Sequence, residues 1–317
     1  MAARVVYIGT QEATAHAFEE LAARDFPRLD LYATDDRVGA PAHLADAEAI
    51  IAHHFQFDDA LLRSAPKLRW IQSLTTGTDG IFKLPSLRPE VIVTSTRGMH
   101  GPQMSELVFL QMLALSRRFP LILQNQERRH WERWPQPLLL GKTIVIVGVG
   151  RIAEALAVRC RCFGMSVYGV SQSPRVPSGF DRIYPRAELA TAAALADFLV
   201  VVVPYAADTE SLVDARVIGA MKPTAFLINV ARGGVLDEDA LLQAVRERRI
   251  AGAALDVFRE TPLPPGSPLW SDERIIITPM LGGMSDIYLA QAYPVIRDNL
   301  GLFLAGETGA MKNVVDR

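Results

Sequence analysis

The sequence predicts an α/β protein built from two doubly wound, Rossmann-like domains with parallel sheets. Short apolar runs alternate with helical patterns, one of these runs is apolar almost throughout, and a glycine-rich turn follows that run directly. A chain of 317 residues, half of them apolar, is long enough for two domains of ordinary size.

The first third of the chain predicts one parallel sheet. Strands are expected at residues 5–8, 49–52, 70–74 and 91–94. Helical patterns at residues 12–23 and 58–64 fall between them, and a longer one covers about residues 104–118. This alternation places helices on both faces of a parallel sheet.

A second series of strands begins after Gly141. Residues 143–147, TIVIV, form an apolar run typical of the middle of a parallel sheet. Further strands are expected at residues 165–170, 198–203, 225–230, 252–255 and 275–278, and a last helix at about residues 285–304. Two doubly wound domains are the simplest account of this order.

The composition excludes several classes of partner. A net charge of −2 leaves no basic excess to neutralise nucleic acid or an anionic membrane. No apolar run approaches the roughly 20 residues that span a bilayer, and the N-terminus shows no charged-then-apolar leader. Cys160 and Cys162, two apart in a helical pattern, are expected to be reduced thiols with no metal ligands nearby. We therefore expect a cytoplasmic protein without a bound metal.

The turn after residues 143–147 predicts a dinucleotide site. Gly148 is suited to the tight turn, Gly150 lets the pyrophosphate approach the backbone, and the small Ala153 lets the helix pack on the strand. The helix N-terminus then offers free N–H groups and a partial positive charge. The alternative is a glycine turn in another α/β sheet, with or without a nucleotide.

The end of the next strand favours NADP over NAD. An NAD site usually has an acidic residue there, about twenty residues past the turn, to bind the ribose hydroxyl. Residues 170–175, VSQSPR, contain no acid, whereas Ser171, Ser173 and Arg175 can hydrogen-bond a 2′-phosphate. The alternative for Arg175 is a solvated loop.

The order of motifs resembles the D-isomer-specific 2-hydroxyacid dehydrogenase family, which includes glyoxylate/hydroxypyruvate reductases. The motifs are GVGRIA at residues 148–153, MKP at 221–223, NVARGG at 229–234, ALDVF at 254–258 and TP at 278–279. The resemblance covers essentially the whole chain. It implies a discontinuous, flavodoxin-like substrate-binding domain, residues 1–99 and 285–317, with a dinucleotide-binding domain, residues 100–284, inserted into it and an active site between them.

The resemblance also implies roles for single residues. Arg232 matches the catalytic arginine, which bridges the carboxylate and the reacting oxygen of a 2-oxo acid. Residues 74–79, LTTGTD, match a glycine loop in which the N–H groups of Thr76 and Gly77 hold the carboxylate. Asp256 matches an acid near the nicotinamide carboxamide. Further cofactor contacts are expected at Arg151, Ile152, Val203, Pro204, Val230, Ala231 and Gly282.

Two catalytic positions depart from the family pattern. The proton-donating histidine should follow Thr278-Pro279, where Met280 stands, and Thr261 occupies the place of its glutamate partner. The last of the six histidines is His130, so no shift of alignment restores the donor. His100, expected to border the substrate pocket, is the candidate donor; the alternatives are a structural role for it, the weaker acids Tyr205 and Tyr288, or water. Met99, Met280 and Thr261 predict a less polar substrate pocket.

Two functions follow from this pattern. The first is an oxidoreductase that transfers a hydride between NAD(P)H and a small 2-oxo or 2-hydroxy acid, with an atypical or missing proton donor. The second is a catalytically impaired, nucleotide-binding sensor or scaffold. The long helix and the segment with Trp131 and Trp134 resemble the family's dimerisation surface and predict a homodimer, unless these tryptophans cover the protein's own core.

Overall fold

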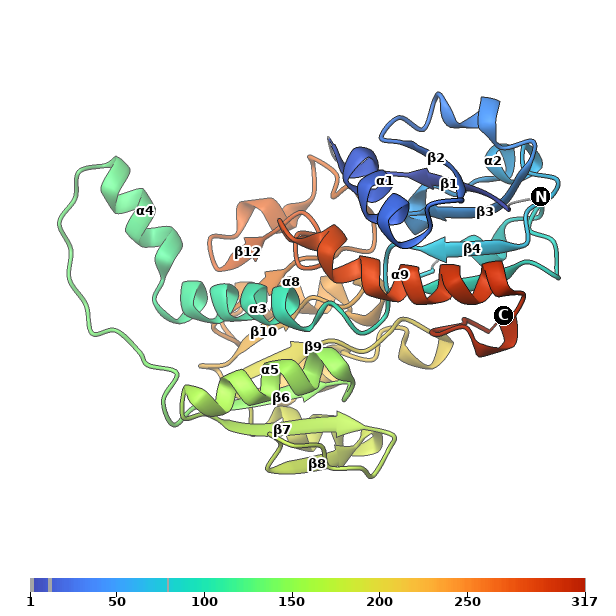
Figure 1. Cartoon of the computed structure of the whole chain (residues 1–317). Helices are drawn as coiled ribbons and strands as arrows, with labels where there is room; N and C mark the ends of the chain where they lie inside the picture. Colours follow the sequence, from blue (N-terminus) through green and yellow to red (C-terminus); the bar gives the residue numbers. More distant parts are fainter. Residues whose placement is uncertain (1–2, 11–12, 79, 317) are drawn as a thin grey trace. The chain divides into compact units, whose positions relative to one another are not determined.

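The computed structural model describes residues 3–10, 13–78 and 80–316. The chain divides into two compact units, unit 1 with residues 1–99 and 285–317 and unit 2 with residues 100–284. In the described residues, each unit holds one sheet of parallel strands, five in unit 1 and seven in unit 2 (Figure 1). The predicted fold class is therefore confirmed.

The sheet of unit 1 has the strand order β2-β1-β3-β4-β5. The strands are β1 Arg4–Ile8, β2 Asp30–Thr34, β3 Ala47–Ala52, β4 Trp70–Ser73 and β5 Ile92–Ser95. The helices are α1 Thr14–Asp25, α2 Asp59–Arg63 and α9 Tyr288–Ala305. Because all strands run parallel, their carboxyl ends share one edge of the sheet, where ligands of open α/β sheets bind.

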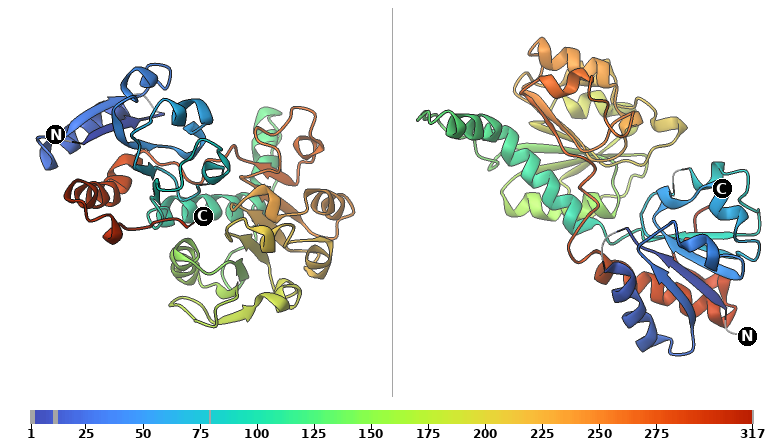
Figure 2. Two further views of the ribbon diagram at one scale, coloured as in Figure 1. Left: turned by 90° about the vertical axis from the view of Figure 1, so that its right-hand side faces the viewer. Right: turned by 90° about the horizontal axis from the view of Figure 1, so that it is seen from above.

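Alternating side chains of β1 build the two faces of the unit 1 core. Val6 and Ile8 belong to the apolar cluster that α2 covers, whereas Val5 and Tyr7 belong to the cluster with α1 and α9. Figure 2 shows α1 and α9 on the same side of this sheet. A buried hydrogen bond of 3.1 Å from Asn299 Nδ2 to Gln72 Oε1 fixes α9 against β4.

The sheet of unit 2 has the strand order β12-β11-β10-β9-β6-β7-β8. The strands are β6 Thr143–Val147, β7 Ser166–Ser171, β8 Arg182–Pro185, β9 Phe198–Val201, β10 Phe226–Asn229, β11 Gly252–Leu255 and β12 Ile275–Ile277. The helices are α3 Gly101–Ser116, α4 Phe119–Glu127, α5 Arg151–Cys162, α6 Leu189–Ala193, α7 Ala215–Ala220 and α8 Glu238–Arg246.

The β6 run explains why this sheet is buried on both faces. Ile144 and Ile146 pack in the cluster with α3 and α5, whereas Val145 and Val147 pack in the cluster with α6, α7 and α8. All four are at most 1% exposed. Burying each of these side chains fully contributes about 1.5–3 kcal/mol relative to exposure. The interior position of β6, between β9 and β7, holds the following turn in place.

Three elements differ from their predicted form. The short edge strands β2 and β8 were not predicted, because DLYAT and RIYP carry polar residues and lack a sustained apolar pattern. The long helix ends at Ser116, and α4 begins after Arg118, whose φ of 55° breaks the helical path. Residue 12 of the first predicted helix lies outside the described residues.

In the described part of the chain, no helix combines the length and apolar character needed to cross a membrane. Cys160 is buried and Cys162 is exposed, and neither is in a disulfide.

Candidate functional site

The turn between β6 and α5 has the geometry of a phosphate site. Gly148 has a φ of 97°, and a Cβ there would lie 2.8 Å from the backbone of Val203, so only glycine fits. Gly150 caps α5 without a side-chain hydrogen bond, and a Cβ on it would meet no atom within 4 Å. The start of α5 therefore offers uncapped N–H groups to open space, which fits a pyrophosphate.

The other residues predicted around this turn have distinct environments. Ala153 is fully buried and lets α5 pack on the sheet. Arg151 and Pro204 are exposed, whereas Ile152 is partly buried. Val230 and Ala231 are 4% and 6% exposed, so their side chains pack in the core and only their backbone is suited to contact a cofactor.

The end of β7 forms a serine-rich turn. Ser171 Oγ accepts a hydrogen bond of 3.0 Å from Ser173 N, and Ser173 Oγ accepts one of 3.4 Å from Arg175 N. Arg175 is 72% exposed and pairs with Glu154 at 3.3 Å. The turn thus presents two hydroxyl groups and a solvated guanidinium on the same short segment.

Arg186 is a charged neighbour of this turn that the sequence did not indicate. Pro185, the last residue of β8, pairs with Ser171, so Arg186 follows at the same edge of the sheet. Its Nη1 donates to Asp208 Oδ2 at 2.6 Å, and this bond is the main reason that the pKa of Asp208 lies below its usual value. Asp208 also accepts from Gln172 Nε2 at 3.3 Å. An acid therefore does reach the turn, but Arg186 neutralises it.

The turn after β10 positions Arg232. The side chain of Asn229 accepts from Ala231 N and donates to the carbonyl of Arg232, each at 3.1 Å. A Cβ at Gly233 would lie 1.9 Å from the carbonyl carbon of Phe258, so a glycine is required directly after the arginine. Arg232 is partly buried, and its Nη1 donates to the carbonyl of Ala231 at 2.7 Å.

His100 lies in the electrostatic neighbourhood of Arg232. His100 is the N-cap residue of α3 and is 6% exposed. Its ring packs near Gly283: a Cβ atom added to that glycine would lie 3.8 Å from His100 Cδ2. Burial, together with the positive charge of Arg232, lowers the pKa of His100 to about 4. The imidazole is therefore neutral at neutral pH, with Nδ1 or Nε2 able to accept a proton.

Asp256 organises the turn that follows β12. Its carboxylate is 3% exposed and accepts from Thr278 Oγ1 at 2.5 Å, Leu281 N at 2.9 Å and Gly282 N at 3.0 Å. Burial raises the pKa of Asp256, and these three hydrogen bonds oppose the rise. Gly282 is buried in the same turn, where a Cβ would lie 2.9 Å from Met104 Sδ and Leu107 Cδ2.

The two departures from the family pattern lie on the surface of unit 2. Met280 has a φ of 57° and is 44% exposed, and its N–H donates to the carbonyl of Asp256 at 3.0 Å. Thr261 is exposed, and its Oγ1 donates to the carbonyl of Phe258 at 3.3 Å. Neither Met280 nor Thr261 can donate a proton as an acid at neutral pH.

The glycine loop of unit 1 follows β4. Ser73 and Thr75 donate to the carbonyl of Gly77 at 3.3 and 2.7 Å. Thr76 is exposed and Gly77 is partly buried, whereas Asp79 lies outside the described residues. His54, which the sequence did not indicate, lies at the same edge, with Nδ1 2.8 Å from Thr75 Oγ1.

Three further predicted residues have structural contacts. Met99 is partly buried against the apolar core of unit 1. The hydroxyl of Tyr288 donates to the carbonyl of Leu74, and burial raises the pKa of Tyr288. Tyr205 is 44% exposed, and its ring packs against Gly234. A Cβ atom added to that glycine would lie only 2.6 Å from the ring. Tyr288 is therefore a poorer acid than a free tyrosine.

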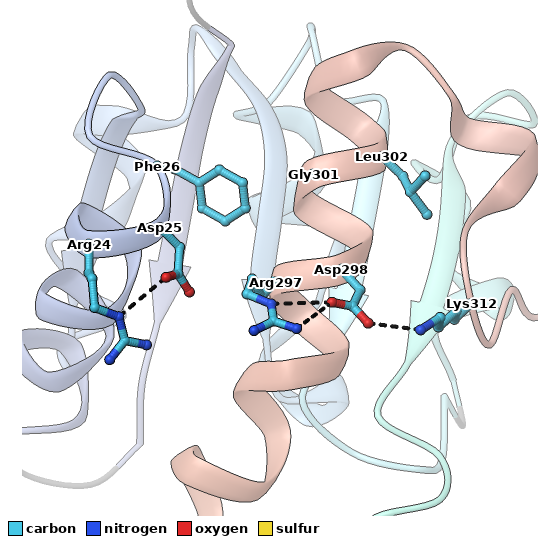
Figure 3. A pocket seen from close by; sticks show the side chains of 8 residues that line it. All are labelled: Arg24, Asp25, Phe26, Arg297, Asp298, Gly301, Leu302 and Lys312. Carbon is cyan, nitrogen blue, oxygen red and sulfur yellow. Dashed lines mark hydrogen bonds and ion pairs between the residues drawn. The ribbon is translucent and has the colours of Figure 1, made fainter.

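A hollow of about 740 Å³ on unit 1 is not part of the predicted site (Figure 3). It is lined by Arg24, Asp25, Phe26, Arg297, Asp298, Gly301, Leu302 and Lys312. Each of its charged side chains is in an ion pair, including Arg297 with Asp298 at 2.9 Å and Lys312 with Asp298 at 2.8 Å. Over the described residues, no group of three or more His, Cys, Asp or Glu side chains could hold a metal.

A glycine turn at an uncapped helix start, after an interior strand of a parallel sheet, defines a dinucleotide-binding α/β protein. The family model for "D-isomer specific 2-hydroxyacid dehydrogenase, NAD binding domain" matches residues 109–282. The glyoxylate reductase of Thermococcus litoralis is 32% identical over 79% of this chain and 78% of its own length. The (S)-sulfolactate dehydrogenase of Chromohalobacter salexigens is 32% identical over 84% of this chain and 89% of its own length.

Solved structures give the same result. A D-isomer specific 2-hydroxyacid dehydrogenase family protein from Aeromonas salmonicida is 34% identical with a TM-score of 0.91, covering 100% of this chain and 99% of that one. The NADPH-dependent glyoxylate/hydroxypyruvate reductase of Sinorhizobium meliloti, in complex with NADP and sulfate, is 25% identical with a TM-score of 0.85, covering 100% and 98%. The chain belongs to the D-isomer specific 2-hydroxyacid dehydrogenase family and is an NAD(P)-dependent 2-hydroxyacid dehydrogenase-like enzyme.

Proposed function

We propose that this protein reduces a small 2-oxo acid to the 2-hydroxy acid with NADPH. The observation that carries the proposal is Arg232, which Asn229 and Gly233 hold in a fixed turn beside His100. The planar guanidinium is suited to bind the substrate carboxylate and to stabilise the negative charge that develops on the reacting oxygen. When bound, the nicotinamide supplies the hydride. Within unit 1, the N–H groups of Thr76 and Gly77 are proposed to bind a substrate carboxylate.

The proton must reach the oxygen by a route other than the usual histidine. We propose His100 as the group that holds it. A pKa of about 4 leaves about one in a thousand rings protonated at pH 7, three pH units higher. An anionic substrate bound to Arg232 would offset the positive charge of the guanidinium and so raise the pKa of His100. Burial, the larger cause of the low pKa, would remain. The neutral ring of the free enzyme is the form that accepts a proton during oxidation of the hydroxy acid.

Two features of the turn after β7 support NADPH as the preferred cofactor. Ser171, Ser173 and Arg175 lie where the 2′-phosphate of a bound cofactor is expected. The two acids that contact this turn are both paired with an arginine, Asp208 with Arg186 and Glu154 with Arg175, and so add little repulsion. Similar solved structures include a D-isomer specific 2-hydroxyacid dehydrogenase from Xanthobacter autotrophicus in complex with NADPH and the NADPH-dependent reductase from Sinorhizobium meliloti in complex with NADP, each 25% identical to this chain.

The second candidate function is a nucleotide-binding sensor or scaffold with little turnover. Met280 favours it, because a thioether stands where the family's proton donor is expected. A missing positioned acid typically lowers turnover about 10²–10⁴-fold. Arg232 favours the enzyme, because a scaffold needs no guanidinium for an anionic substrate.

We also propose that the protein is a homodimer formed through the segment from α3 to β6. Large apolar side chains are exposed along it, at Leu110, Phe119, Leu123, Trp131, Leu138 and Leu140. Trp134 instead stacks on Arg118, with the guanidinium 5.5 Å from the ring centre, and so covers its own chain. In Figure 1, α4 leads away from the sheet of unit 2 before the chain returns to β6. An exposed apolar surface of this kind is typical of an interface between protein chains, and a second copy of the chain can cover it.

A substrate panel tests the proposed function. Glyoxylate, hydroxypyruvate, larger 2-oxo acids and simple aldehydes are assayed for oxidation of NADPH and NADH, with cofactor binding titrated in parallel. We expect turnover of a 2-oxo acid with NADPH and none of the aldehydes, which lack the carboxylate. Tight cofactor binding without turnover of any compound would support the sensor instead.

A further inference from the structure

Two neighbouring strands bring His54 to the glycine loop of unit 1. β3 and β4 are parallel partners, with Ala52 opposite Ser73, so the residues that follow them emerge at the same edge. His54 begins the 3-10 turn after β3, His54–Gln56. Its Nδ1 lies 2.8 Å from Thr75 Oγ1, although the two residues are 21 positions apart.

The distances around Thr75 favour one set of hydrogen-bond directions. Thr75 Oγ1 donates its single proton to the carbonyl of Gly77 at 2.7 Å, because a carbonyl can only accept. Thr75 Oγ1 also lies 2.9 Å from Ser73 Oγ, which is the more distant donor to the same carbonyl at 3.3 Å. The shorter contact of Thr75 favours its proton on the carbonyl, and we therefore take Nδ1 of His54 as the nitrogen that donates to the hydroxyl. A continuous chain results, from His54 Nδ1–H to the Thr75 hydroxyl and from that hydroxyl to the Gly77 carbonyl.

This chain fixes the orientation of the peptide between Gly77 and Thr78. The Gly77 carbonyl also lies 3.3 Å from the hydroxyl of Ser73, which is fully buried. In a trans peptide the N–H points opposite to the carbonyl, so the N–H of Thr78 is turned away from this polar cluster. Among the contacts of the described residues, neither Gly77 N nor Thr78 N donates a hydrogen bond. Adjacent unpaired N–H groups form an anion-binding concavity.

We propose that His54 is a positioning residue for the substrate carboxylate: acting through Thr75, it fixes the Gly77 carbonyl so that the N–H of Thr78 is presented to the anion beside that of Gly77. The proposal rests on the proposed function, since it names how unit 1 binds the acid. The proposal adds the N–H of Thr78 to the expected carboxylate donors Thr76 and Gly77. The role of His54 depends only on the proton at Nδ1.

The test compares three variants of the holoenzyme. His54→Phe removes the Nδ1 donor, Thr75→Val removes the bridging hydroxyl with little change of shape, and His54→Asn retains a side-chain N–H where Nδ1 stood. We expect His54→Phe and Thr75→Val to raise the KM for the 2-oxo acid about fivefold to tenfold, the effect of one hydrogen bond. His54→Asn should keep KM near wild type, and none of the three should change kcat or NADPH affinity by more than about twofold.

A double variant and a binding measurement separate this role from general damage. His54→Phe combined with Thr75→Val should be no worse than either single change, because both break the same chain. Oxamate, an unreactive 2-oxo acid analogue, should bind the NADP⁺ form of the single variants more weakly by the same factor as KM.

Three outcomes would overturn the assignment. They are an unchanged KM and oxamate affinity in both His54→Phe and Thr75→Val, a His54→Asn variant as impaired as His54→Phe, or fully additive effects in the double variant. Were His54→Phe to fail to fold, Thr75→Val alone carries the comparison. A wild type that binds oxamate but turns over no 2-oxo acid would refute the proposed function and leave the oxamate comparison to decide the role of His54.

Discussion

At His100, burial and the guanidinium of Arg232 act in the same direction, since both disfavour the charged ring. Reduction needs the protonated form, whose population in the free enzyme falls tenfold for each pH unit above a pKa of about 4. We therefore expect kcat/KM for reduction to rise about tenfold per unit as the pH is lowered from 8 towards 5. For oxidation, which needs the neutral ring, kcat/KM should be constant in this range and fall only near pH 4. Initial rates in both directions measure this, and a flat reduction profile would assign the proton to water.

Replacing the ring tests the same residue directly. His100→Ala should lower kcat for reduction about 10²–10⁴-fold, the usual contribution of a positioned acid. The affinity for NADPH should stay unchanged, because the phosphate turn and the β7 turn do not involve His100. His16→Ala is the matched control, since this histidine is 74% exposed on α1. Equal turnover in the His100 and His16 variants would exclude His100 as the donor.

At the level of elements, the turn after β7 determines the choice of cofactor. Arg175 pairs only weakly with Glu154, at 3.3 Å and 72% exposure, so its guanidinium can reorient to a phosphate at small cost. Arg175→Ala should weaken NADPH binding about tenfold and NADH binding less than twofold, measured by fluorescence titration. Arg182→Ala is the charge-matched control, because Arg182 lies on β8 over the ring of Tyr184, 4.2 Å from its centre. Equal losses for both cofactors would contradict the NADPH preference.

The elements also show what the sequence could and could not predict. The apolar run of β6 and the turn at Gly148 were predicted correctly, because both depend on residues adjacent in sequence. Arg186 was missed because β8 has no apolar pattern and only its pairing with β7 places residue 186 beside Ser171. His54 was missed because its contact with Thr75 depends on the pairing of β3 with β4.

Asp256 shows a different kind of limit. The motif ALDVF identified the residue, but not that Thr278, Leu281 and Gly282 would occupy its carboxylate. That arrangement depends on a register in which β12 ends beside β11, with Ile277 opposite Leu255. Its role next to the nicotinamide stays a prediction, and the structure adds a second role for it in shaping the turn that carries Met280.

For the whole molecule, the apolar segment between α3 and β6 is exposed and needs a surface to cover it. Trp131 is 89% exposed, and Phe119, Leu123 and Leu140 are between 45% and 67% exposed on the same segment. Leaving this much apolar surface in water is unfavourable, and a second copy of the chain presents the same surface for burial. We expect the wild type to have twice the chain mass of 34.8 kDa by light scattering after size-exclusion chromatography.

Substitutions that make this apolar segment polar should dissociate the dimer without unfolding the chain. Leu123→Asp combined with Trp131→Ala places a charge in the apolar segment and removes its largest exposed ring, so the mass should fall to that of one chain at micromolar concentration. Trp270→Ala is the control, because Trp270 is 53% exposed outside this segment and its Nε1 donates to the carbonyl of Pro264 at 3.0 Å. A wild type that already elutes with the mass of one chain, or a double variant that keeps twice that mass, would show that this segment does not form the dimer.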